Sequence, residues 1–137
     1  MPQKWTSEQV EEYLRSTLSE AGFDLTPPRE NGETGADIIA KKGDQSLFFE
    51  AIGYKSSPPA RSKDFYEVFF RAISRLRKGA TKCIIALPAQ FGVGMPQRAA
   101  QYGIAWERLG NSFPELSIWL VDTNAGSHTE HAWNEWA

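Results

Sequence analysis

Two carboxylates, Asp37 and Glu50, stand where the sequence predicts a β-hairpin. Residues 36–42 and 45–54 have strand-like composition, and they flank Gly43-Asp44, a pair suited to a two-residue turn. With that turn the numbers of facing residues sum to 87, which puts Asp37 opposite Glu50. Facing residues in an antiparallel pair hold their Cβ atoms about 4.5–5.5 Å apart, where like charges repel. The pair therefore needs a partner of opposite charge.

The nature of that positive partner decides the chemistry. Glu50 interrupts an otherwise apolar run, and burying an unpaired carboxylate costs several kcal/mol. A divalent ion would neutralise both carboxylates, and ligand sets made only of oxygen suit Mg²⁺ or Mn²⁺. Asp37 and Glu50 are therefore the expected metal ligands. The alternative is that Glu50 pairs with an arginine of the basic helix that follows, or reaches solvent at a strand end.

A third carboxylate is predicted on the first helix. Thr6 and Gln9 form a capping-box pattern, and apolar residues then recur at helical spacing, which predicts a helix over about 7–21. At roughly 100° per residue, Glu11 borders the apolar face of this helix, whereas Glu12 points away. Glu11 is the candidate third metal ligand, with a solvated glutamate as the alternative.

Basic residues concentrate in one segment of the chain. Between Lys55 and Lys82 there are eight Lys and Arg against two Asp and Glu, a local charge of +6, whereas the rest of the chain carries -8. This asymmetry is typical of a protein with an anionic partner at one face, although a solvated helix with a basic last turn gives the same pattern. The candidate nucleic-acid-binding residues are Lys55, Arg61, Lys63, Arg71 and Arg75.

The order of the predicted elements indicates an α/β fold. A helix, three strands, a helix, a strand, a helix and a strand predict one domain over 1–137, with a mixed central sheet flanked by helices. Residues 123–137 are expected to form an extended or helical tail with His128 and His131 in solvent, and Gly92-Val93-Gly94 to form a turn. Besides those above, the expected elements are a strand at 23–26, a loop at 29–35, a helix at 61–78 after Pro58-Pro59, a strand at 81–87, a helix at 97–109 and a strand at 116–121.

An acidic residue at the start of one strand, a second within the next strand and a basic helix after them resemble the PD-(D/E)XK superfamily, which includes restriction endonucleases. The similarity covers Glu11, residues 35–38, residues 49–54 and the helix that carries Arg71 and Arg75. The resemblance implies a restriction endonuclease-like fold. It also implies hydrolysis of phosphodiester bonds in nucleic acid, DNA in particular, with Mg²⁺ or Mn²⁺ as cofactor.

One position departs from the pattern of that superfamily. A lysine normally lies two residues after the glutamate, where it positions the attacking water, and here that position is Ile52. Lys55 is the nearest replacement, and it completes the expected catalytic set with Asp37 and Glu50. The two helix arginines offer a fixed charge but are too basic to deprotonate water. A bound metal can also lower the pKa of its own water without any protein base.

Three functions are consistent with these observations. They are an active nuclease, a catalytically degenerate nuclease-fold protein that binds nucleic acid or a protein partner, and a protein-interaction module with Trp133 and Trp136 as aromatic anchors. The chain has no apolar stretch of about 18 residues and no secretory leader, so a cytoplasmic protein without membrane association is expected, with a homodimer left open. Cys83 is the single cysteine, and its apolar neighbours predict a buried thiol.

Overall fold

The β-hairpin forms in the predicted register. The computed structural model describes residues 6–28 and 36–136, so the expected loop at 29–35 lies outside the described residues. Strands β2 (Ile38–Lys42) and β3 (Gln45–Ala51) pair antiparallel, and every pair in their ladder sums to 87. Gly43 has a φ of 59°, a value that the tight turn requires and that glycine adopts without strain.

Within the described residues, six strands form one mixed sheet whose spatial order follows the chain from β1 to β6. The three central strands β3, β4 and β5 are parallel, and the outer pairs are antiparallel. The α/β class, with a mixed sheet flanked by helices, is confirmed. The other elements are α1 (Ser7–Glu20), β1 (Asp24–Leu25), α2 (Pro58–Ser74), η1 (Arg75–Lys78), β4 (Lys82–Pro88), α3 (Phe91–Tyr102), α4 (Ile104–Ser112), β5 (Leu116–Asp122), β6 (Ser127–Ala132) and η2 (Trp133–Trp136).

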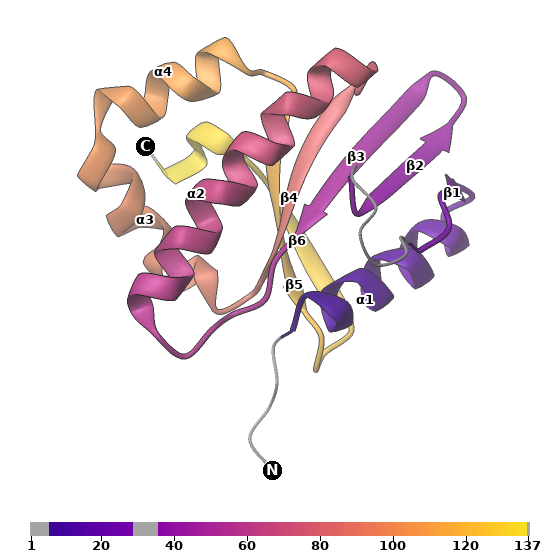
Figure 1. Ribbon diagram of the computed structural model, residues 1–137, viewed down its shortest axis with the longest axis horizontal. Coiled ribbons are helices and arrows are strands. Elements are labelled where there is room, and N and C mark those ends of the chain that lie inside the picture. Colours follow the sequence, from indigo (N-terminus) through magenta and orange to yellow (C-terminus); the bar gives the residue numbers. More distant parts are fainter. Residues whose placement is uncertain (1–5, 29–35, 137) are drawn as a thin grey trace.

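The sheet separates two apolar cores. Helix α1 packs on one face of the sheet, whereas α2, α3, α4 and η2 cover the other (Figure 1). Side chains alternate along a strand, so Phe49 enters the α1 core while the neighbouring Glu50 points to the α2 side. Both faces of β3 are thus buried, which explains why its sequence is apolar nearly throughout and why Glu50 is exceptional in it.

The largest differences from the predicted elements concern the helices after the hairpin. Helix α2 begins at Pro58, three residues early, because the first helical turn has no internal partner for an N–H and so tolerates proline. Residues 92–94 lie inside α3 and do not form a turn. The helix expected at 97–109 is two helices, because Gly103 has φ 54° and ψ -121°, a conformation that interrupts the helix and that side chains disfavour.

The C-terminal segment is a paired strand, not a solvated tail. β6 lies antiparallel to β5 along six residue pairs. His128 stacks on Trp119 with ring centroids 4.3 Å apart, and its Nδ1 lies 2.6 Å from the Tyr13 hydroxyl of α1. The expectation of a solvated His128 and His131 is therefore wrong, because β6 pairs with β5 and the two rings, 16% and 19% exposed, pack against Trp119 and Trp136. In the part of the chain that the structure describes, no helix combines the length and apolarity needed to cross a bilayer.

Two tryptophans close the core on the α2 side. The Trp106 and Trp133 rings stack with centroids 4.0 Å apart, and each indole N–H donates to the backbone carbonyl of the other residue at 2.8 Å. Trp133 is 3% exposed, so the predicted aromatic anchor for a partner instead packs in the protein's own core. The partly buried Trp136 packs against His131.

Candidate functional site

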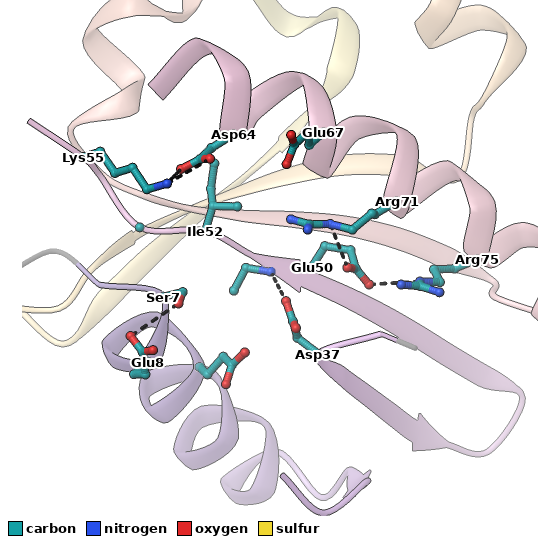
Figure 2. A pocket seen from close by; sticks show the side chains of 13 residues that line it. Ser7, Glu8, Asp37, Glu50, Ile52, Lys55, Asp64, Glu67, Arg71 and Arg75 are labelled. Carbon is teal, nitrogen blue, oxygen red and sulfur yellow. Dashed lines mark hydrogen bonds and ion pairs between the residues drawn. The ribbon is translucent and has the colours of Figure 1, made fainter. Parts of the chain in front are cut away.

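A cavity of about 600 Å³ opens between α1 and α2, at the end of the β2–β3 hairpin that is opposite its turn. Figure 2 shows Asp37 and Glu50 extending from the sheet into this space, with the α2 side chains opposite α1. Among the described residues, its lining includes six carboxylates and three cationic side chains, a formal charge of -3. The lining residues are Ser7, Glu8 and Glu11 from α1, Asp37, the segment Glu50 to Gly53, Lys55, and Asp64, Glu67, Arg71 and Arg75 from α2 and its end.

Asp37 is held directly before the first residue of β2. The regular pairing of β2 with β3 ends at Ile38 and Phe49. The Asp37 N–H donates a further hydrogen bond to the Phe49 carbonyl at 3.1 Å. The Asp37 side chain then accepts a hydrogen bond at Oδ2 from the Ala51 N–H, at 2.8 Å. One carboxylate oxygen thus satisfies a backbone donor of β3, which fixes the direction in which this buried side chain faces the cavity.

Glu50 is almost fully buried, with a side-chain exposure of 2%, and it meets two arginines. Arg75 donates from Nε to Oε2 at 3.1 Å, while Arg71 Nε lies 3.7 Å from Oε1. The arginine pairing that the sequence left open as an alternative to a metal is therefore present. Two positive charges hold the carboxylate, and they also compete with any cation for its oxygens.

The pKa of Glu50 is raised above its ordinary value. Burial is the largest cause, because it penalises the charged carboxylate. The hydrogen bond from Arg75 opposes this rise, and the negative charge of Asp37 adds to it. This effect of Asp37 on the Glu50 pKa agrees with the close approach of the two carboxylates that the hairpin register predicted.

The raised pKa predicts how stability depends on pH. The folded protein retains the Glu50 proton to a higher pH than the unfolded chain, so the contribution of Glu50 to stability is present below about pH 4.5 and is lost as pH rises through its folded-state pKa. Relative to Glu50→Gln, which cannot titrate, the free energy of unfolding of the wild type should fall with rising pH above about 4.5. Urea unfolding of both proteins across this range measures the difference. A difference that stays constant, or grows in favour of the wild type, contradicts the expectation.

Four cavity residues with polar side chains were not singled out from the sequence. Ser7 and Glu8 lie one turn before Glu11 on α1. On α2, Glu67 follows Asp64 by three residues and Arg71 follows Glu67 by four. This spacing places all three side chains on one helix face. That spacing could have indicated the site from sequence, because it gathers acidic and basic side chains on one face of the helix.

Lys55 reaches the cavity but is tied to α2. Its ammonium lies 3.0 Å from Asp64 Oδ2, and its side chain is 61% exposed. Ile52, which stands at the position of the superfamily's lysine, lines the same cavity while packing with the α2-side core. The cavity therefore has a lysine at its rim and hydrocarbon where the resemblance implies a lysine.

Two predicted nucleic-acid-binding residues do not reach the cavity. Arg61 donates from Nη1 to the Lys55 and Ser56 carbonyls at 2.7 and 3.0 Å, and it stacks over the Tyr54 ring at 4.4 Å. These contacts indicate that Arg61 orders the connection between β3 and α2. Lys63 is exposed and lies 4.0 Å from Glu67.

The donor atoms fit a metal that is only partly enclosed by protein. Across residues 6–28 and 36–136, no three His, Cys, Asp or Glu side chains gather closely enough to hold an ion by themselves. Mg²⁺, however, is often bound by one or two carboxylates, while waters and substrate phosphates complete its shell. Asp37 and Glu50 match that smaller set of hard oxygen donors. Glu11 lines the same cavity without joining them in such a group.

Cys83 contributes no nucleophile. It is buried, and burial, followed by the negative charges of Glu115 and Glu50, raises the pKa of its thiol to about 11. The thiol is therefore protonated at neutral pH, whereas thiol chemistry requires the thiolate.

No family model, no curated protein and no solved structure matches this chain. The function therefore has to be inferred from the chemistry of the cavity itself.

Proposed function

We propose that the cavity is the active site of a divalent-metal-dependent phosphodiester hydrolase that acts on nucleic acid. One observation carries the proposal: two buried carboxylates, one directly before β2 and one in β3, line an acidic cavity that two arginines also line. Arg71 and Arg75 neutralise Glu50, but the second buried carboxylate beside it still raises its pKa, and perturbed carboxylates in a cleft favour a functional site. Cations beside them suit a substrate that carries phosphate.

Each residue has a distinct task in this proposal. Asp37 and Glu50 would hold the metal, and Glu11, which lines the same cavity, would accept hydrogen bonds from the waters of the metal. The bound metal would supply a water of lowered pKa and stabilise charge on the phosphate. Lys55 and Arg71, both at the exposed rim, would bind phosphate oxygens. Ile52 takes no part in proton transfer, since its side chain has no group that can accept or donate a proton.

The direct test uses the wild-type protein and a titration with Mn²⁺. Isothermal titration calorimetry should detect saturable Mn²⁺ binding, and labelled single- and double-stranded DNA should be cleaved with Mn²⁺ or Mg²⁺ but not with EDTA. RNA of the same sequence identifies which nucleic acid is preferred. A well-folded protein that binds no Mn²⁺ and cleaves neither DNA nor RNA contradicts the proposal.

A catalytically degenerate nucleic-acid-binding protein is the second candidate. The Glu50 contacts with Arg71 and Arg75 favour it, because they neutralise the carboxylate without a metal. Cleavage by the wild type separates the two candidates, and the variant Ile52→Lys, with Ile52→Met as the uncharged control, tests the active-enzyme candidate further. If the wild type is active, the added lysine should raise the cleavage rate by about 100-fold, the lower range for a positioned acid–base group. Nucleic-acid binding without cleavage in the wild type selects the degenerate protein instead. Because Ile52 is only 5% exposed, circular dichroism must first show that both variants fold.

The interaction-module hypothesis loses its main support. It relied on exposed tryptophan anchors near the C-terminus, and Trp133 is buried against Trp106. An anchor must be accessible to the partner before binding, so Trp133 cannot serve as one in this fold.

A further inference from the structure

The two arginines that contact Glu50 are held very differently. The Arg75 side chain is 15% exposed and hydrogen-bonded to Glu50 Oε2 at 3.1 Å. The Arg71 side chain is 48% exposed, and its Nε lies 3.7 Å from Oε1, which is an ion-pair contact beyond hydrogen-bond range. Arg75 is thus a fixed partner, while Arg71 contributes charge through a loose and solvent-accessible contact (Figure 2).

We propose that Arg75 positions Glu50 whereas Arg71 exchanges Glu50 for a substrate phosphate, so that the anion must bind before the metal can bind tightly. The inference rests on the proposed function, because it assigns the order in which phosphate and metal enter the same cavity. In the substrate-free protein, Arg71 neutralises Oε1. When a phosphate binds the Arg71 guanidinium, Glu50 Oε1 becomes available to the metal.

The chemistry of the exchange follows from the charges on the cavity wall. A metal that approached Glu50 with both guanidiniums in place would meet two like charges around one carboxylate. Guanidinium binds phosphate through two parallel hydrogen bonds, so a phosphate offers Arg71 a better partner than a contact at 3.7 Å. The same phosphate can then complete the metal shell that Asp37 and Glu50 leave open.

The position of Arg71 on α2 supports these different roles of the two arginines. Arg71 lies one helical turn before Arg75 on the same face, closer to the exposed Glu67. Arg75 is the first residue of η1, directly after α2, and its largely buried side chain has less freedom to leave Glu50. The exposed arginine can therefore turn toward a ligand in the cavity mouth while the buried one keeps Glu50 oriented.

The test measures Mn²⁺ affinity by calorimetry in two buffers of equal ionic strength, one containing chloride and one containing sulfate as an uncleavable tetrahedral oxyanion. Wild type should bind Mn²⁺ about 30-fold more tightly in sulfate, which is the effect of removing one unit charge about 4 Å from a doubly charged ion in water. Arg71→Ala should already bind about 30-fold more tightly in chloride, with no further gain in sulfate. Arg71→Lys, which keeps the charge, should restore the sulfate dependence. Arg77→Ala, which removes an exposed arginine of η1 outside the cavity, should behave as wild type.

The outcomes separate this inference from the proposed function. Absence of Mn²⁺ binding in every buffer and variant overturns both. Wild type that binds Mn²⁺ and cleaves nucleic acid, with equal affinity in chloride and sulfate or with no tightening in Arg71→Ala, overturns the exchange while leaving the hydrolase intact. If Arg71→Ala fails to fold, Arg71→Gln provides the same comparison, because it removes the charge and retains most of the side chain's volume. Tighter binding in both Arg71→Ala and Arg77→Ala also overturns the exchange, because it would reflect net charge alone.

Discussion

Replacing Glu50 with glutamine is expected to lower metal-dependent cleavage at least about 100-fold, because loss of groups that merely support metal ligands already costs 10- to 100-fold. Glutamine keeps the shape of the side chain, and its carbonyl oxygen can still accept the Arg75 hydrogen bond. The variant should therefore fold while losing the charge that binds the metal. Initial rates with labelled DNA and saturating Mn²⁺, together with calorimetric Mn²⁺ affinity, measure the two effects separately.

Glu12→Gln is the matched control for this experiment. Glu12 lies on the exposed side of α1, outside the cavity, and the substitution makes the same chemical change. Its rate should stay within about threefold of wild type, as for other surface substitutions. Equal rates for wild type and Glu50→Gln would remove Glu50 from the mechanism and with it the proposed site.

Replacing Trp133 with alanine is expected to cost about 3–5 kcal/mol in the free energy of unfolding, the range for deletion of a large buried aromatic side chain. The substitution removes the ring stacked on Trp106 and leaves the Trp106 carbonyl without the indole donor it now has at 2.8 Å. Phe65 and Phe69 also lose a neighbouring ring. Because small domains are stable by only about 5–15 kcal/mol, this one change should remove a large share of the total.

Urea unfolding monitored by far-ultraviolet circular dichroism measures this loss. Trp136→Ala is the control, because Trp136 is only partly buried and its effect should be clearly smaller. If Trp133→Ala is as stable as wild type, η2 is not a structural part of the core and Trp133 remains available as an anchor for a partner.

The hairpin and its acidic pair could be predicted from sequence because their causes are local. The Gly43-Asp44 turn fixes the register, and a two-residue side-chain period then determines which residues share a face. The helix spacing around Glu11 is local in the same sense, and the structure places that residue in the cavity while Glu12 remains outside it. The cavity carboxylates of α2 were missed although their three- and four-residue spacing was visible.

Other features depended on contacts between distant parts of the chain. The pairing of β6 with β5, the stacking of Trp133 on Trp106 and the capture of Asp37 Oδ2 by the Ala51 N–H are set by partners that local periodicity does not identify. For the same reason the sequence left the partner of Glu50 open between a metal and an arginine.

The sequence by itself determined the α/β class, the hairpin register and the presence of a buried glutamate beside an aspartate, because turn chemistry and strand periodicity act over a few residues. Tertiary structure decided which groups surround that glutamate. It placed Arg75 within hydrogen-bond distance and Arg71 just beyond it, since only the packing of α2 across the sheet sets how deeply each arginine is buried. Burial determines the strength of each contact, and that difference separates a fixed partner of Glu50 from one that a ligand can displace.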